Sequence, residues 1–304
     1  MPDVVIMLVF AVAASPIEER VTAVEARLAH LERENHAALK LQLLGVTRSA
    51  TIQETKMQAA VPMKPAKIAA LHRPALARKK IAKGTPLKDW PPLPNRNAIH
   101  PILEELGFTT GIEVGVQKGR NALVTLRNWH SCTSYKLVDM WASTTEVYND
   151  TANIGARAQL ANYRHAQSQL QHWTKRNVTE FYRMKSVDAA PKFKDGAFDY
   201  VYIDARHDYC GVMEDLRAYW PKVRPGGIFA GHDFVDAAWV SSQKWGANQD
   251  WSICADGSKE PRAVKGAVED FAKEQGLAIT VTGSAAVLNS SESWLIQKPT
   301  RLRF

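Results

Sequence analysis

From Ala98 onward, short β-branched or aromatic runs alternate with longer segments of helical periodicity, and this alternation constrains the fold more than any other feature. Strands separated by helices form parallel sheets that are covered on both faces. We therefore expect an α/β domain with a doubly wound, mostly parallel seven-stranded sheet and helices on both faces. The expected strands are residues 111–116, 135–141, 179–186, 198–205, 227–234, 278–283 and 293–299. In such sheets, ligands bind at the carboxyl ends of the strands.

The positive charge of the chain is concentrated before this domain. Residues 1–99 contain 15 Lys and Arg against 8 Asp and Glu, whereas residues 100–304 contain 24 against 23. The formal net charge of +8 therefore belongs mostly to the N-terminal third. We expect no nucleic-acid-binding surface on the folded domain.

Residues 1–15 form an apolar segment whose core is a run of eleven apolar residues at positions 4–14. The run is too short for a membrane span, which needs roughly 20 residues. It has the length of a signal peptide, although Asp3 stands where a basic residue is usual. We expect targeting to the secretory pathway or membrane anchoring through the N-terminus in preference to a cytoplasmic location. The alternative is a short apolar helix that packs locally.

Residues 16–46 are expected to form a short coiled-coil-like helix. Apolar residues and one asparagine recur at alternating spacings of three and four: Val21, Val24, Leu28, Leu31, Asn35 and Ala38. Such a seam favours a homo-oligomer, and a single amphipathic helix is the alternative. Residues 47–95 are rich in Lys, Arg, Ala and Pro and are expected to form a basic flexible linker. The folded domain then covers residues 96–304.

The three cysteines are few and widely spaced. Cys132, Cys210 and Cys254 show neither metal-ligand spacing nor a disulfide framework. We expect unpaired thiols, with one disulfide as the alternative if the chain is secreted.

Residues 111–122, GIEVGVQKGRNA, place two glycines between an expected strand and an expected helix. Gly115 and Gly119 either serve ordinary turn chemistry or let the backbone approach a nucleotide-like ligand closely. Gln117 stands where a dinucleotide-binding fingerprint has its middle glycine, so a diphosphate is not expected. Asp139 ends the next strand, where a carboxylate can bind ribose hydroxyls, with a helix cap as the alternative.

A resemblance to the class I S-adenosylmethionine-dependent methyltransferases is carried by four segments in the order of that family. They are GIEVGVQKGRNA, LVDMW, FDYVYIDARHDYCGVMEDLRAYWPKVRPGGIFAGHDF and AVKGAVEDFAKEQG. The third is similar to the Methyltransferase-24-like branch, with Ile-Asp-x-x-His-x-Tyr after the fourth strand and His-Asp after the fifth. The resemblance spans about residues 98–298 and implies a Rossmann-like methyltransferase domain with S-adenosylmethionine as cofactor.

The resemblance implies a cofactor-binding set at the carboxyl ends of the first four strands: Glu113, Gly115, Gly119, Asp139, Met140, Ser186, Asp188 and Asp204. Glu113 is then near the methionine end of the cofactor, and Asp204 is beneath the methyl donor. Trp141 and Val187 are expected beside the adenine.

Related O-methyltransferases hold a divalent ion with acids that follow the fourth and fifth strands. Asp204, His232 and Asp233 occupy the matching places, and this donor set suits Mg²⁺ or Mn²⁺. We expect Asp204 and His207 to be catalytic, with His207 as general base because an imidazole titrates near neutral pH. Arg206 stands where this branch commonly has an acid, and its positive charge disfavours a metal ion nearby. Backbone capping by His232 and Asp233 is the alternative.

A long connection at residues 236–261 follows the fifth strand and contains Trp239, Trp245 and Trp251. These tryptophans either stack on a sugar or aromatic acceptor or cover the core. The predicted reaction is O-methylation of a sugar, glycan or small-molecule hydroxyl, assisted by a divalent ion if one is bound. The alternatives are a non-catalytic cofactor-binding scaffold and a nicotinamide-dependent oxidoreductase, against which Gln117 counts.

Overall fold

The computed structural model describes residues 81–82, 84–144, 150–283 and 291–300. The chain divides into two compact units, residues 1–77 and 78–304, and every described residue belongs to the second. The apolar segment at residues 1–15, the coiled coil at residues 16–46 and most of the linker therefore lie outside the described residues. Within the described part, no helix combines the length and apolarity needed to cross a bilayer.

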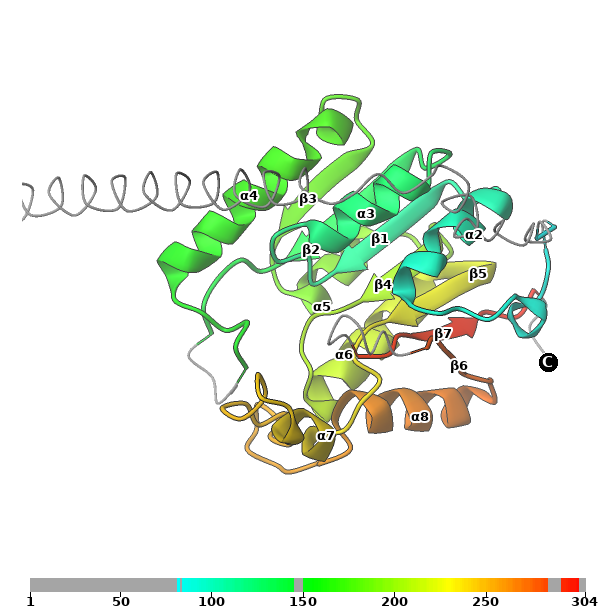
Figure 1. The fold of residues 1–304 in the computed structure, drawn as a ribbon. Coiled ribbons are helices and arrows are strands. Elements are labelled where there is room, and N and C mark those ends of the chain that lie inside the picture. Colours follow the sequence, from blue (N-terminus) through cyan, green and yellow to red (C-terminus); the bar gives the residue numbers. More distant parts are fainter. Residues whose placement is uncertain (1–80, 83, 145–149, 284–290, 301–304) are drawn as a thin grey trace, which may run out of the picture. The chain divides into compact units, whose positions relative to one another are not determined.

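Seven strands form one sheet in the order β3-β2-β1-β4-β5-β7-β6 (Figure 1). Their bounds are β1 Thr110–Val114, β2 Ser134–Asp139, β3 Thr179–Arg183, β4 Phe198–Ile203, β5 Val223–Gly231, β6 Thr280–Val281 and β7 Trp294–Gln297. The first five strands pair in parallel, whereas β7 lies antiparallel to both β5 and β6. The predicted α/β class, the seven strands and their mostly parallel pairing are confirmed.

Helices cover both faces of this sheet (Figure 1). Their bounds are α2 His100–Glu105, α3 Arg120–Asn128, α4 Ala156–Thr174, α5 Ser186–Ala189, α6 Tyr209–Tyr219, α7 Ala237–Ser242 and α8 Ala263–Gln275, with 3-10 turns η2 Leu87–Asp89, η3 Arg96–Ala98, η4 Ala190–Lys192 and η5 Trp220–Lys222. Helices α2, α3 and α4 pack on one face, and α5, α6 and α8 pack on the other. Helix α7 lies within the segment that was expected to be one long connection.

The central strand β4 shows how the sequence divides the core between the two faces. Every residue of β4 is buried. Tyr200 and Tyr202 join the hydrophobic cluster under α2 and α3, whereas Val201 and Ile203 join the cluster under α6 and α8. Successive side chains of a strand point to opposite faces, so a strand that is buried on both sides needs a mostly apolar run, in which Asp199 is the one charged residue here.

The core extends further toward the N-terminus than the boundary expected at residue 96. Leu87, Trp90 and Leu93 are buried in the same cluster as α2 and α3. The backbone N–H of Leu87 also donates to Oε1 of Gln297 in β7, at 2.8 Å. The Pro- and Trp-containing end of the predicted linker therefore packs on the domain, because its apolar side chains cover one face of the sheet.

The expectation of unpaired thiols is wrong for two of the three cysteines. Cys210 and Cys254 form a disulfide between the start of α6 and the connection that follows α7, with a Cα–Cα distance of 5.6 Å. Cys132 is a buried free thiol. The 44 residues that separate the bonded pair in sequence leave no local spacing pattern from which to infer it.

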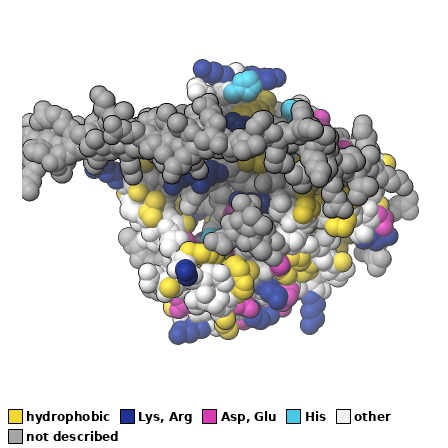
Figure 2. Space-filling model, viewed as in Figure 1, with side chains coloured by type: hydrophobic (Ala, Val, Ile, Leu, Met, Phe, Trp, Pro, Cys, Tyr) yellow, Lys and Arg dark blue, Asp and Glu magenta, His cyan; other side chains and the backbone are white. Residues whose placement is uncertain are grey.

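Charges are mixed on the surface of the domain. Among the described residues on the face shown in Figure 2, Lys and Arg side chains alternate with Asp and Glu over the lower part of the molecule. This mixture is consistent with the nearly equal numbers of acidic and basic residues in positions 100–304.

Candidate active site

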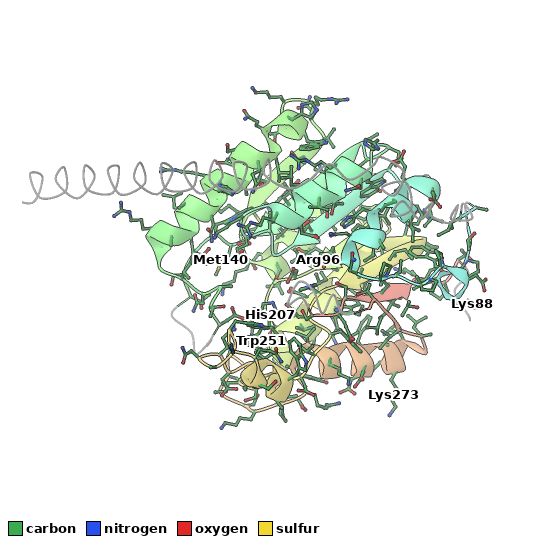
Figure 3. All side chains as sticks on the ribbon, viewed as in Figure 1. Lys88, Arg96, Met140, His207, Trp251 and Lys273 are labelled. Carbon is green, nitrogen blue, oxygen red and sulfur yellow. A yellow bond between two sulfur atoms is a disulfide. The ribbon has the colours of Figure 1, made fainter. Side chains whose placement is uncertain are left out.

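A cavity of about 650 Å³ lies at the carboxyl ends of β1, β2 and β4. In Figure 3, Met140 and Arg96 are labelled on one side of this region and His207 and Trp251 on the other. Seven of the predicted site residues line it: Glu113, Gly115, Asp139, Met140, Ser186, Asp204 and His207. The strand ends expected to bind a ligand therefore do meet at one hollow.

Gly115 is required by the close approach of two strands. Its φ is +90°, and a Cβ atom there would lie 1.8 Å from the carbonyl oxygen of Asp204 at the end of β4. Gly119 also has a positive φ, of +75°, but it packs against Ala166 of α4 and does not line the cavity. Both glycines thus serve the turn itself, and Gly115 also brings the backbone to the cavity wall.

Asp139 ties the end of β2 to the glycine turn. Its Oδ2 accepts hydrogen bonds from the backbone N–H groups of Val116 and Gln117, at 3.0 and 2.8 Å, and its Oδ1 accepts from the N–H of Trp141 at 2.7 Å. Burial raises the pKa of Asp139, against the effect of these three donors. A carboxylate has about four acceptor positions, so Asp139 retains capacity for a further hydrogen bond from the cavity.

Glu113 is a buried carboxyl group on the cavity wall. Its Oε2 accepts from Asn121 at 3.1 Å and from the hydroxyl of Tyr135 at 3.0 Å. Burial raises the pKa of Glu113 to about 8, and these two hydrogen bonds only partly oppose the shift. Glu113 can therefore offer a neutral carboxyl to a ligand at neutral pH.

The residues expected around the adenine divide into two groups. Met140, Ser186 and Val187 line the cavity. Trp141 does not: it has a positive φ of 41°, its side chain is buried, and its indole N–H donates to the carbonyl oxygen of Gln117 at 2.7 Å. Asp188 is exposed on α5 and is also absent from the cavity wall. Trp141 and Asp188 therefore do not line the cavity: the side chain of Trp141 is buried in the core, and Asp188 is exposed on α5.

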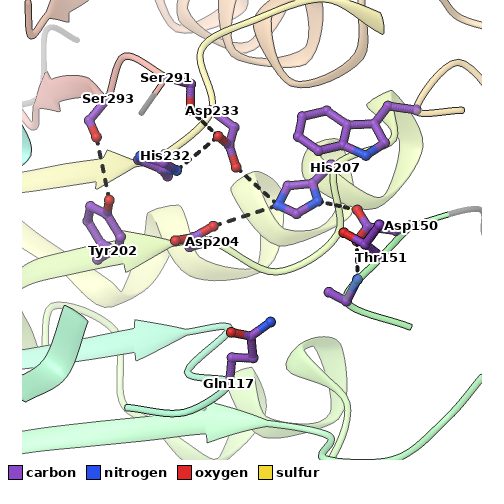
Figure 4. A network of polar contacts seen from close by, with 12 residues as sticks. Gln117, Asp150, Thr151, Tyr202, Asp204, His207, His232, Asp233, Ser291 and Ser293 are labelled. Carbon is purple, nitrogen blue, oxygen red and sulfur yellow. Dashed lines mark hydrogen bonds and ion pairs between the residues drawn. The ribbon is translucent and has the colours of Figure 1, made fainter. Parts of the chain in front are cut away.

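Asp204, His207, His232 and Asp233 come together as predicted, just beyond the ends of β4 and β5 (Figure 4). The ligand atoms of Asp204, His232 and Asp233 lie within 4.8 Å of one another. Nε2 of His207 lies 3.3 Å from Oδ2 of Asp233 and 3.6 Å from Oδ1 of Asp204. The cluster therefore joins two carboxylates to two imidazoles at the cavity edge.

Asp233 is held in place by several neighbours. It adopts a positive φ of 54°, and its Oδ1 accepts from the Ser291 hydroxyl and lies 2.9 Å from Nδ1 of His232. Burial alone would raise the pKa of Asp233, but the imidazoles of His232 and His207 hold that pKa well below its usual range. Burial likewise opposes the charged form of His232, but the carboxylate of Asp233 raises the pKa of His232 above its ordinary value. Asp233 is therefore ionised at neutral pH.

Two contacts of His207 were not foreseen from the sequence. Its Nδ1 lies 2.6 Å from Oδ2 of Asp150, and its ring stacks on Trp251 with a centroid distance of 4.2 Å and an interplanar angle of 21°. Asp150 and Trp251 belong to connections far from His207 in sequence, and neither carries a local motif. Trp251 is buried, whereas Trp239 and Trp245 are partly exposed, so the three tryptophans do not share one role.

Three arginines line the cavity: Arg96, Arg120 and Arg206. Arg206, expected to oppose a cation, forms two hydrogen bonds to Asp208, at 2.9 and 2.8 Å, and one to Glu214 at 3.2 Å. Its charge is thus largely compensated by acids other than Asp204. Arg96 approaches the cluster directly, with Nη1 3.7 Å from Oδ2 of Asp204.

The donor set of this cluster suits a divalent ion. Carboxylate oxygens are the preferred ligands of Mg²⁺ and Mn²⁺, and one imidazole is compatible with Mn²⁺. Nε2 of His207 faces two carboxylates, an arrangement that calls for a proton or a cation between them. Arg96 competes for one oxygen of Asp204. The residues therefore fit a metal, with an arginine as its competitor.

Comparison with known proteins gives one family match and several distant structural neighbours. A family model described as a methyltransferase domain matches residues 112–234, a segment that contains all the predicted site residues. The O-methyltransferase from Bacillus cereus in complex with SAH has 14% sequence identity and a TM-score of 0.46, over 66% of this chain and 80% of that chain. The O-methyltransferase TomG from Streptomyces achromogenes, in complex with SAM, has 13% identity and a TM-score of 0.47, over 67% and 78%. No curated protein sequence matches the chain.

The sheet order, the antiparallel β7 between β5 and β6, and the cavity at the strand ends define a Rossmann-like methyltransferase fold. The family match identifies residues 112–234 as a methyltransferase domain, which is consistent with a class I S-adenosylmethionine-dependent methyltransferase.

Proposed function

We propose that this methyltransferase modifies a hydroxyl oxygen of a sugar, a glycan or another small polar acceptor. The observation that carries the proposal is the position of His207, whose Nε2 lies beside Asp204 and Asp233 at the edge of the cavity. A hydroxyl is a weak nucleophile until it loses its proton, so a neighbouring base assists it directly, whereas a neutral amine already carries a free lone pair.

We propose the following roles for the cavity residues. Asp139 accepts hydrogen bonds from the ribose of the cofactor, Glu113 contacts its methionine end, and Met140 and Ser186 flank its adenine. Bound S-adenosylmethionine supplies an electrophilic methyl carbon on a sulfonium sulfur. The chain aligns the acceptor oxygen with that carbon, and alignment contributes much of the rate.

His207 takes the hydroxyl proton of the acceptor at Nε2 as the new C–O bond forms and the C–S bond breaks. Asp204 and Asp233 lie on the same side of the ring and orient the acceptor hydroxyl by hydrogen bonds or through a divalent ion. If present, Mg²⁺ or Mn²⁺ would be held by Asp204, His232 and Asp233 and would lower the pKa of the acceptor hydroxyl.

The test is transfer of a labelled methyl group from S-adenosylmethionine to a panel of monosaccharides, glycosides, phenols and amines. We expect transfer to hydroxyl acceptors only, and a loss of roughly 10²-fold or more in kcat for His207→Ala. Transfer to amines but not to hydroxyls would refute the acceptor class. Full activity of His207→Ala would refute the base.

The metal requires a separate test. The same reaction is run with Mg²⁺, with Mn²⁺ and with a chelator, beside Asp233→Asn. If the ion is used, the chelator and the variant lower the rate, and added ion restores only the wild-type protein. A wild-type rate that is indifferent to the chelator would leave Asp204 and Asp233 to act through hydrogen bonds.

We also propose that the domain works in an oxidising compartment. The Cys210–Cys254 disulfide supports this location, because such bonds persist mainly in secreted, periplasmic or luminal proteins. The apolar segment at residues 1–15 favours the same location. Thiol labelling of protein taken directly from its cells would contradict the proposal if all three cysteines reacted after denaturation.

A further inference from the structure

His207 is held from two sides by segments that are distant from it in sequence. Asp150 lies 57 residues before it and contacts Nδ1 at 2.6 Å with a side chain that is 2% exposed. Trp251 lies in the connection after α7 and stacks on the imidazole face. Together these contacts restrain both the rotation of the ring and its position along the cavity edge.

Gln249 joins the two segments that hold His207. Its Oε1 accepts from the backbone N–H of Thr151 at 3.1 Å, from the Thr151 hydroxyl at 3.3 Å and from the indole N–H of Trp251 at 3.2 Å. Gln249 is buried, and its amide N–H donates to the carbonyl oxygen of Trp245 at 3.3 Å. One amide therefore links the residue next to Asp150 with the aromatic ring that stacks on His207.

Asp150 is itself fixed before it contacts the imidazole. Its Oδ1 accepts from the backbone N–H of Ala152 at 2.6 Å, which leaves Oδ2 directed at Nδ1 of His207. An ionised carboxylate can only accept hydrogen bonds, so the proton between these atoms belongs to Nδ1. When the imidazole is neutral and an acceptor hydroxyl or a cation lies between Nε2 and the two carboxylates, a proton on Nδ1 makes Nε2 the acceptor. Nε2 is the nitrogen that faces Asp204 and Asp233.

We propose that Asp150 is a positioning residue that fixes the tautomer and orientation of His207, and that Gln249 keeps Asp150 and Trp251 in register around the ring. This inference rests on the proposed role of His207 as base, since it explains how Nε2 is presented to the acceptor. Asp150 does not touch the reacting atoms and acts only through His207. If Asp150 instead had only a structural role, it would stabilise the connection at residues 150–155, and its removal would not change which nitrogen of His207 carries the proton.

The tautomer can be measured without activity. In the full-length protein labelled with ¹⁵N-histidine, His207 should show a downfield, hydrogen-bonded Nδ1–H proton, assigned by its loss in His207→Ala. Asp150→Ala should abolish that resonance. It should also lower kcat by roughly 10²-fold, with little change in the dissociation constant for S-adenosylmethionine. An Nδ1–H resonance that persists unchanged in Asp150→Ala overturns the proposal.

A second variant keeps the test decisive if Asp150→Ala does not fold. Gln249→Leu removes the link between the segments but leaves the carboxylate, so the Nδ1–H resonance should broaden and kcat should fall less than in Asp150→Ala. Gln249→Glu retains an Oε1 acceptor and should restore part of both signals. Unchanged His207 resonances in Gln249→Leu would remove Gln249 from the proposal. If the His207 resonances are also unchanged in Asp150→Ala, the whole proposal is refuted.

A matched control comes from the same connection. Asp236→Ala deletes a carboxylate that caps α7 by accepting from the backbone N–H of Trp239, at 2.7 Å. It should leave the His207 resonances and kcat as in the wild type. Failure of the proposed function would appear differently, as wild-type protein that binds or transfers nothing while the Nδ1–H resonance still depends on Asp150.

Discussion

Nδ1 of His207 lies 2.6 Å from the carboxylate of Asp150, although 57 residues separate the two in sequence. On the other side of the ring, Nε2 faces Asp233 and Asp204. The imidazole thus lies between one carboxylate that can orient it and two that adjoin the cavity. This arrangement distinguishes the site from a cofactor pocket alone, and the predictions below address the parts that build it.

Gly115→Ala should destabilise the domain more than the same substitution at Gly257, another glycine with a positive φ. A Cβ at residue 115 would overlap the carbonyl oxygen of Asp204, and the φ of +90° adds strain of roughly 1–3 kcal/mol. Gly257→Ala is the control, because Gly257 has a φ of +84° and nothing within 4 Å of the added atom. Urea unfolding should show a much larger loss for Gly115→Ala. Equal losses would show that the contact with Asp204 does not matter.

Asp139→Ala should weaken the binding of S-adenosylmethionine. Loss of one hydrogen bond to a charged group costs about 1.5–3 kcal/mol, or roughly 10- to 100-fold in affinity. The glycine turn also loses its two bonds to the carboxylate, and Trp141 loses one. Asp188→Ala removes an exposed carboxylate that does not line the cavity, so its affinity should equal that of the wild type. Calorimetric titration distinguishes the two. A lower affinity of Asp188→Ala for S-adenosylmethionine would support the expectation from the sequence that Asp188 binds the cofactor.

The division between correct and incorrect expectations follows from the range of the interactions. Strand and helix periods are local, so the parallel sheet and the meeting of Asp204, His207 and Asp233 at its edge could be predicted. Sheet topology brings the ends of neighbouring strands together whatever the loops do. The glycine turn was also recognisable, although the contact between Gly115 and Asp204 was not.

The missed features depend on long-range packing or on backbone direction. Asp150, Gln249 and Trp251 meet around His207 through connections that have no repeating pattern. The Cys210–Cys254 disulfide likewise needs two distant segments to be adjacent. Trp141 was expected beside the cofactor, but its φ is positive and its side chain lies in the core. Nothing in the sequence predicts a positive φ at a tryptophan.

Removal of the disulfide should destabilise the domain by about 4 kcal/mol in the chain-entropy description, given the 44-residue separation of its cysteines. Cys210→Ser should therefore lower Tm, and it should also loosen Trp251, which lies three residues before Cys254. Differential scanning calorimetry with and without dithiothreitol provides the check. The reductant should lower the Tm of the wild type but not that of Cys210→Ser. A wild-type Tm that is insensitive to full reduction would contradict the prediction.

Asp215 should make the free energy of unfolding decline as pH rises from about 4 to about 7. Its side chain is buried in α6, its Oδ1 has no hydrogen-bond partner among the described residues, and burial raises its pKa from 3.8 to about 7. Between these two values the folded state holds more protons than the unfolded state, so this group's stabilisation is full below about pH 4 and is lost by about pH 7.

Asp215→Asn should remove that loss, because the amide is neutral at every pH. Its Tm relative to the wild type should therefore be higher at pH 8 than at pH 5. Asp188→Asn, on an exposed surface of α5, should show no such difference. The interpretation fails if the Tm gap between Asp215→Asn and the wild type is the same at both pH values.

The most direct test of the central claim is calorimetric titration of the full-length protein with S-adenosylmethionine. The account predicts saturable binding at one site per chain, competition by S-adenosylhomocysteine, near-normal affinity for His207→Ala and weaker affinity for Asp139→Ala. Absence of binding, or binding that is indifferent to Asp139→Ala, would contradict the assignment of the cofactor to the cavity at the ends of β1, β2 and β4.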